Sequence, residues 1–289
     1  MASYAKMIAA GKRWDKLFIL VGLSSMLVGL ITLSALIIDL AIDGVPRLSL
    51  NFFTSFPSRF PEEAGILSAW VGTSLVMLVT ALSAVPLGIA AGIYLEEYSR
   101  KNWLTDFIEI NIANLAGVPS IIYGLMALGL FVYQLHLGQS ILTAGLTLAL
   151  LILPMVIMAT REAIRSVPTA MREAAYAVGS NKWEVVKDHV LPYSTGGILT
   201  GVIIGLSRAI GETAPLITIG ALTFIAFLPK SLMDPFTVMP IQMFNWVSRP
   251  QEAFHFNAAA AGLVLMAMTL AMNGLAFYIR FRFRKKIKW

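Results

Sequence analysis

Six long apolar stretches constrain what this chain can fold into, because each is long enough to cross a lipid bilayer. A helix needs about 20 mostly apolar residues to cross the hydrocarbon core. Hydrophobic residues make up 57% of the 289-residue sequence and charged residues only 13%, which leaves no sizeable soluble domain. The sequence therefore predicts an all-α, polytopic membrane bundle with six transmembrane helices. The stretches cover residues 17–40, 67–94, 107–135 and 141–160, a fifth that begins near Gly197, and residues 258–279.

We expect a single transmembrane domain over residues 1–289. Residues 1–66 contain the first helix and an external connector, and residues 67–280 contain the helical core. Within that core, residues 161–196 form a charged segment between two apolar stretches, and a basic tail follows at 281–289.

Polar residues inside the third stretch and in the last connector call for separate interpretations. Asn111, Asn114 and Ser120 lie in the third stretch around Pro119, and we expect these polar groups to face the interior of the bundle. The connector over residues 227–256 contains the amphipathic stretch MPIQMFNWV. We expect this stretch to lie on the membrane surface or to close the mouth of a pathway.

The distribution of basic residues predicts the orientation of the chain. Six spans place both termini on one side of the membrane, and most of the 22 lysines and arginines fall on that side. Cytoplasmic loops are enriched in lysine and arginine, so we expect both termini and the charged segment to be cytoplasmic. Only a few basic residues fall on the other side, namely Arg47, Arg59, Lys230 and Arg249.

The fifth stretch carries charges where lipid would not tolerate them. At 3.6 residues per turn, Gly201, Gly205, Arg208, Glu212 and Pro215 share one helix face. An arginine within the membrane costs about 2.5–3.5 kcal/mol unless it faces protein or water and finds a partner. We expect Arg208 to pair with Glu212, either as a structural ion pair between helices or as part of a substrate pathway. The glycines are expected to let another helix approach closely.

The charged segment reads as two short helices. Pro168 suits a first helical position, and Gly179 suits the residue just past a helix end. Asn181 followed by Glu184 is typical of a capping box. Pro192 is expected to end the second helix.

The spacing within this segment is more specific than its charge. The triplet Glu173-Ala174-Ala175 is followed after three residues by Gly179, and further on by Leu191 and Pro192. This pattern resembles the EAA loop of permease subunits of bacterial ABC importers, with His189 where that family usually has isoleucine. The resemblance implies a type I importer permease (MetI-like) fold. It also implies that these six residues dock on a separate ATPase subunit.

Within that family the chain resembles phosphate permeases of the PstA type along nearly its whole length. Four stretches carry the resemblance: GVPRLSLNFFTSFPS from Gly44, AVPLGIAAGIYLEEY from Ala84, NLAGVPSIIYGLMALGLFVY from Asn114 and LSRAIGETAPL from Leu206. The resemblance implies a phosphate importer of the bacterial inner membrane. Its implied partners are a homologous but distinct permease, two copies of an ABC ATPase, and an extracytoplasmic phosphate-binding protein.

The last of these motifs supplies the candidate pathway residues. We expect Ser207, Arg208, Glu212 and Thr213 to line the substrate pathway. Related sulfate and molybdate permeases resemble RALGEFGA at this position, so the residues that follow Glu212 favour phosphate. A permease for sulfate, molybdate or tungstate remains an alternative, as do a secondary transporter, a channel or a membrane-embedded sensor.

Several classes of chemistry are excluded for the chain itself. It has no cysteine and no glycine-rich nucleotide-binding loop, and its three histidines lack metal-ligand spacing. We therefore expect no catalytic residue, no metal and no cofactor in this chain, with ATP and magnesium used by the partner ATPase. Its basic residues lie between and beyond apolar spans, which argues for contact with membrane lipid and against nucleic acid.

Overall fold

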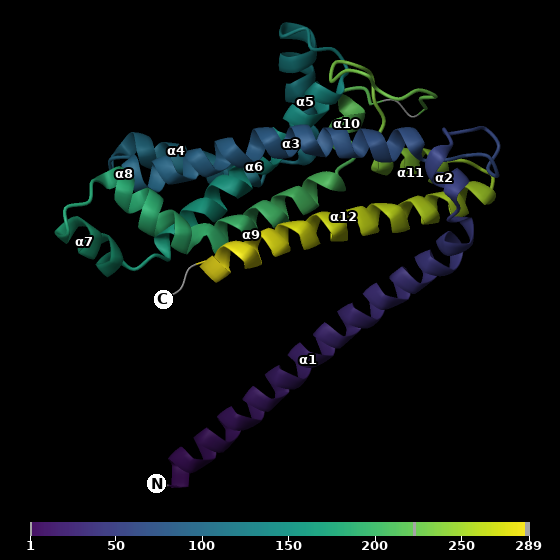
Figure 1. The fold of residues 1–289 in the computed structure, drawn as a ribbon. Helices are drawn as coiled ribbons and strands as arrows, with labels where there is room; N and C mark the ends of the chain where they lie inside the picture. The colour runs from purple at the N-terminus through teal and green to yellow at the C-terminus, as the bar shows by residue number, and fades with distance from the viewer. Residues whose placement is uncertain (1, 222–223, 287–289) are drawn as a thin grey trace.

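A computed structural model describes residues 2–221 and 224–286, and the elements in these residues are all helical. Among these residues, five helices are long and apolar enough to cross a membrane, or six if a bent helix pair is counted as one span. The all-α bundle predicted from the sequence is confirmed. Figure 1 shows the long helices side by side, except for the first, which leaves the bundle.

The first helix, α1 (Ala2–Gly44), contacts the rest of the chain only at its end. Its apolar window within Trp14–Arg47 is 0% buried. At its last turn the chain packs tightly on another helix, α12 (Ala253–Lys286): a Cβ at Gly44 would lie 2.9 Å from the Ala259 backbone. Two short helices follow, η1 (Val45–Arg47) and α2 (Leu50–Thr54).

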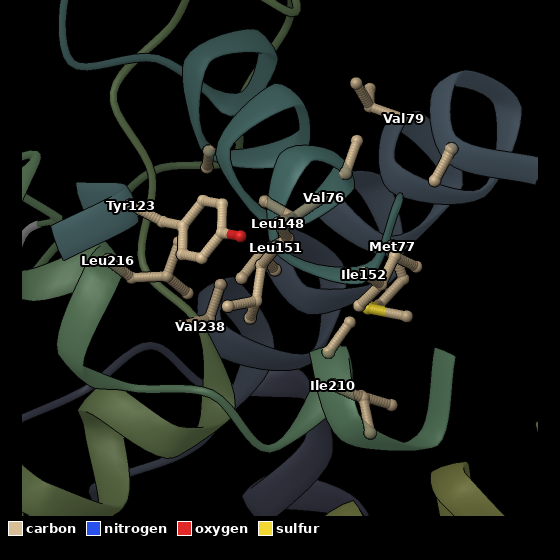
Figure 2. Close-up of a cluster of buried hydrophobic side chains, with 14 of the residues drawn as sticks. Val76, Met77, Val79, Tyr123, Leu148, Leu151, Ile152, Ile210, Leu216 and Val238 are labelled. Atoms are coloured by element: carbon tan, nitrogen blue, oxygen red, sulfur yellow. The ribbon is translucent and has the colours of Figure 1, made fainter. Parts of the chain in front are cut away.

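Close packing between α3 (Leu67–Ile93) and α6 (Ile141–Arg165) forms the centre of the bundle. Gly88 and Gly92 of α3 lie directly against Val156 and Thr160 of α6, where an added Cβ would come within 2.7 Å of either side chain. Glycines at such contacts let helix backbones approach closely. Figure 2 shows the apolar core that results, with Leu148 and Ile152 at its centre.

The third apolar stretch is not one straight helix. It consists of α4 (Trp103–Ala116) and α5 (Ser120–Ala127), and α5 continues as the π-helix η3 (Leu128–Gln134). The bend between α4 and the helix formed by α5 and η3 is 106°. Pro119 lacks an N–H and restricts the residue before it to extended backbone, so the helix breaks there. The Tyr123 hydroxyl donates to the Leu115 carbonyl oxygen at 2.8 Å and closes the bend.

The bend also overturns the expectation for the polar residues of this stretch. Asn111 and Asn114 are exposed on α4, and the Asn111 amide donates to the Phe107 carbonyl of its own helix. Ser120 is half-buried at the start of α5. Because α4 turns away from α5 at Pro119, its outer face is left without a helix from this chain to cover it.

The amphipathic stretch of the second connector forms α11 (Met239–Val247), which buries one face, including Ile241 and Trp246, and exposes Phe244 and Val247 on the other. It packs against α12 and α3, and the Met239 N–H donates to the Thr73 hydroxyl at 2.9 Å. The Trp246 ring is tilted against Phe52 and stacked on Phe254. This aromatic cluster offers the apolar face of α11 a protein surface instead of lipid.

The charged segment lies at the end of the bundle where α12 ends, opposite the end at which α1 meets the bundle (Figure 1). It contains α7 (Thr169–Ala177), α8 (Lys182–Glu184) and the π-helix η4 (Val185–Val190). The π-helix η2 (Tyr94–Tyr98) ends α3 at the same end.

Candidate functional site

The predicted ion pair is present at the end of α9 (Leu191–Ile210). Arg208 Nε lies 3.2 Å from Glu212 Oε1, one helical turn further on. Arg208 sits in the last turn of α9, where the helix dipole favours a cation. The Arg208 side chain is 38% exposed and the Glu212 side chain 16% exposed. The Arg208 side chain is therefore partly accessible to a ligand or a second chain, although its Nε is paired.

The structure corrects the position of Pro215. Neither Pro215 nor Glu212 shares a helix with Arg208, because α9 ends at Ile210 and residues 211–213 are irregular. Pro215 instead lies in the first turn of a new helix, α10 (Ala214–Thr218), where its missing N–H costs nothing. It is buried against Gly124 of α5.

The glycine face of α9 packs on α6, as predicted. Gly201 is buried directly against the Ala159 side chain, and a Cβ at Gly197 would come within 2.7 Å of the Ala163 Cβ. Gly205 lies closest to Val156 and is buried as well. These contacts fix the position of α9, and through it that of Arg208, relative to the core.

Ser207 and Thr213 lie in different surroundings from the ion pair. The Ser207 hydroxyl lies 2.7 Å from Asn273 Oδ1 on α12 and the same distance from the Ile203 carbonyl oxygen. Thr213 precedes α10, and its carbonyl accepts from the N–H groups of Leu216 and Ile217. Sequence reasoning missed Asn273, although an asparagine inside an apolar span is itself a signal of an interhelical contact.

Tyr123 is a second residue near the ion pair that the sequence did not single out. It is 4% exposed and belongs to the same apolar cluster as Leu206 and Ile210 of α9, which flank Arg208 in the sequence. Figure 2 shows its ring beside Leu216 of α10. The ion pair therefore lies close to the bend between α4 and α5.

The predicted docking residues divide between two faces of α7. Glu173 and Ala174 are exposed, whereas Ala175 is 5% exposed and packs into an apolar cluster with Val185 and Val190. Gly179 ends this helix with a φ of +90°, a conformation that favours glycine. The predicted helix end is confirmed, although Pro168 precedes the helix and is not its first residue.

The predicted capping box starts the second short helix. The Glu184 N–H donates to Asn181 Oδ1 at 3.0 Å, and the Asn181 N–H donates to Glu184 Oε2 at 2.8 Å. The prediction that Pro192 ends this helix was wrong. The π-helix η4 runs directly into α9, and Leu191 and Pro192 lie in the first turn of α9. His189 lines an open, largely apolar recess of about 510 Å³ together with Ala170, Met171, Ala174, Ala175 and Val178.

Comparison with known sequences covers nearly the whole chain. Residues 84–285 match the family described as binding-protein-dependent transport system inner membrane component. The chain is 33% identical over 282 residues to the phosphate transport system permease protein PstA of Yersinia pestis, covering 96% of this chain and 93% of that one. It is 33% identical over 242 residues to the probable ABC transporter permease protein YqgI of Bacillus subtilis, with 82% and 81% covered.

Solved structures show the same fold at low identity. A chain of a bacterial alginate ABC transporter, solved in complex with its alginate-bound periplasmic protein, matches with a TM-score of 0.68 at 15% identity. That match covers 94% of this chain and 96% of the other. A chain of the MetNI methionine ABC transporter matches with a TM-score of 0.58 at 14% identity, covering 73% and 94%. The expected type I importer permease fold is confirmed, and the chain belongs to the binding-protein-dependent transport system inner membrane components, among the permeases of the PstA type.

Proposed function

We propose that this chain is one of two permease subunits of an ATP-driven ABC importer that moves inorganic phosphate across the bacterial inner membrane. The observation that carries the proposal is the match to PstA of Yersinia pestis over nearly the full length of both chains. A second phosphate permease, PstA of Haemophilus influenzae, is 31% identical over 279 residues. The ion pair at the end of α9 supplies chemistry that suits this substrate.

Members of this family are transport subunits, and ATP is hydrolysed by a separate ATPase. In our proposal that ATPase uses magnesium with ATP, and this chain binds neither. The chain works with such an ATPase and with a substrate-binding protein. In our proposal it pairs with a homologous but distinct permease, sits on two copies of the ATPase, and receives phosphate from an extracytoplasmic phosphate-binding protein. The exposed α4 face and the uncovered α1 supply surfaces for the second permease and for lipid.

We further propose that both termini and the charged segment are cytoplasmic. The charged segment lies at the end of the bundle where α12 ends, and six spans would place the basic residues of the N-terminus, of this segment and of the C-terminus on one side. Positive charge is retained on the cytoplasmic side of inner-membrane proteins. This orientation places Glu173 and Ala174, together with Gly179, on the surface that the ATPase contacts.

Arg208 and Glu212 can together distinguish phosphate from sulfate. The exposed N–H groups of the Arg208 guanidinium can donate charge-assisted hydrogen bonds to an oxyanion. The Glu212 carboxylate can accept a hydrogen bond from a protonated phosphate oxygen. Sulfate has no such proton at neutral pH and meets repulsion from the carboxylate. Ser207 and Thr213 complete the pathway residues in this proposal.

Uptake of labelled phosphate by the reconstituted importer tests the proposed substrate. Uptake should require ATP and should be blocked by excess arsenate but not by sulfate or molybdate. Uptake of molybdate or sulfate, but not of phosphate, would support an ABC importer and refute phosphate as its substrate. Uptake driven by an ion gradient without the ATPase would favour a secondary transporter.

Two variants test the pathway residues in the same vesicles. Arg208→Gln should abolish uptake while the complex with the ATPase assembles, whereas Arg59→Gln, at an exposed arginine in the connector before α3, should have no effect. Glu212→Gln should weaken the preference for phosphate over sulfate. An unchanged preference would mean that Glu212 only holds Arg208, and retained uptake in Arg208→Gln would refute the pathway role.

A further inference from the structure

The π-helix η2 directs two consecutive glutamates to different helices. A π-turn widens the helix by one residue per turn and often occurs at functional sites. Glu97 Oε1 lies 2.9 Å from the nearest guanidinium nitrogen of Arg172 on α7, whereas Glu96 Oε1 lies 2.9 Å from Arg165 Nε on α6. The end of α3 is therefore bonded to both the core and the charged segment.

Arg172 holds α7 through several bonds at once. Its Nε and Nη2 atoms donate to Glu97 Oε1 at 3.2 and 2.9 Å. Its Nη1 donates to the Val167 carbonyl oxygen at 2.7 Å, and Nη2 donates to the Ile164 carbonyl oxygen at 3.0 Å. These carbonyls belong to the last turn of α6 and the residues after it, where backbone acceptors lack helical partners. One side chain thus joins α7 to the ends of both α3 and α6.

A second contact joins η2 to the other short helix of the charged segment. Lys182 Nζ of α8 lies 5.0 Å from the centre of the Tyr98 ring, within cation–π range. Beneath both contacts, Ile93 of α3 packs against the apolar cluster that includes Ala175 and Val185. The charged segment is therefore attached to the end of α3 and to η2 by two polar contacts and one apolar contact.

The remaining charges at this end fix η2 to the core. Glu96 Oε2 lies 3.4 Å from Arg161 Nε, and Arg161 Nη2 lies 2.5 Å from Glu109 Oε1 on α4. The Arg161 side chain is only 9% exposed. The helices α3, α4, α6 and α7 consequently meet at one turn of chain.

We infer that Glu97 and Arg172 are positioning residues that transmit movement of the charged segment to α3, and through α6 to the ion pair at the end of α9. The inference rests on the proposed function. The outer face of α7 exposes Glu173 and Ala174 to the ATPase, and its inner face carries Arg172. A nine-residue helix moves as a unit, so a shift of the outer face shifts Arg172. Close glycine contacts then connect α3 to α6, and α6 to α9.

The test is the number of ATP molecules hydrolysed per phosphate imported by the complete importer in proteoliposomes. Glu97→Gln removes the charge that holds Arg172 and should raise this ratio about tenfold. The amount of bound ATPase and the hydrolysis rate should stay unchanged. Glu97→Asp keeps the charge and should restore part of the coupling. Glu162→Gln is the matched control, because that carboxylate is 73% exposed and pairs only with its neighbour Arg165 among the ion pairs of the described residues.

A milder pair of variants keeps the test valid if Glu97→Gln does not assemble. Tyr98→Leu removes the ring over Lys182 and should raise the ratio about twofold, whereas Tyr98→Phe keeps the ring and should not change it. An unchanged ratio in Glu97→Gln or Tyr98→Leu would overturn the inference. So would a fall in import and hydrolysis by the same factor, which loss of the ATPase would cause. Absence of phosphate uptake in the unaltered importer would instead reject the proposed function.

Discussion

Gly201→Ala should destabilise the bundle, because the added methyl group would meet the Ala159 side chain directly. The cost of overpacking a helix contact is about 1–3 kcal/mol. Gly201 lies seven residues before Arg208, or about 10 Å along the helix axis. A forced separation of α9 from α6 at this point should therefore also displace the ion pair and lower uptake.

A glycine on α12 provides the control. Gly274 has nothing within 4 Å of an added Cβ, so Gly274→Ala gains the helix propensity of alanine without a clash. The difference between the two variants therefore isolates the clash. It should appear as a lower thermal midpoint for Gly201→Ala in the purified subunit, by about 3 °C per kcal/mol. Phosphate uptake should fall in Gly201→Ala only.

Removing the opposing methyl group should restore the contact. In the double variant Gly201→Ala with Ala159→Gly, one methyl group simply replaces another across the interface. The double-mutant cycle should give an interaction free energy of about 1–3 kcal/mol. Equal midpoints for Gly201→Ala and Gly274→Ala, or no rescue by Ala159→Gly, would refute the argument that this glycine sets the distance between α6 and α9.

Three further predictions concern the charged segment. Ala174→Cys should crosslink to a cysteine on the ATPase, whereas Ala175→Cys should not, because Ala175 lies on the buried inner face of α7. The reverse pattern in an active complex would contradict the assigned faces. Gly179→Ala should lower the local stability of the charged segment by about 1–2 kcal/mol. An added Cβ would meet no neighbour, so the cost comes only from the strained backbone at a φ of +90°, and hydrogen exchange over residues 169–190 should accelerate. Asn181→Ala should lower the stability of α8 by about 1 kcal/mol, because it removes the N-terminal cap. Equal hydrogen-exchange rates at the start of α8 in the variant and the unaltered protein would contradict this.

Local patterns in the sequence predicted much of the charged segment and of α9. The capping box at Asn181 and the helix end at Gly179 depend only on neighbouring residues, and both are present. The pairing of Arg208 with Glu212 follows from their spacing of one turn. These features need no knowledge of distant parts of the chain.

The interruption of the third stretch at Pro119 was predicted, but the helix starts at Pro192 and Pro215 were not. A proline removes one N–H, which is compatible both with the interruption of a helix and with its first turn. Pro192 and Pro215 both begin helices, and Pro119 breaks one at an angle of 106°. The choice between these outcomes depends on packing partners, such as Gly124 against Pro215, that lie far away in the sequence.

Burial of the connectors depended on long-range contacts as well. The pattern of α11 shows an apolar face but not what covers it, and Phe52 and Phe254 supply the cover. The junction at η2 was missed for a similar reason. The two adjacent glutamates carry no local signal of a junction, because the three arginines that pair with them come from α6 and α7.

The isolation of α1 has a thermodynamic consequence. This helix of 43 residues is about 65 Å long, and its apolar window buries nothing within the described chain. Its burial by lipid or by another subunit is a binding equilibrium, which stabilises the folded state by about 2.7 kcal/mol when the covering molecule is present at 100 times its dissociation constant. The melting temperature of this subunit should therefore vary with dilution and with the surrounding lipid.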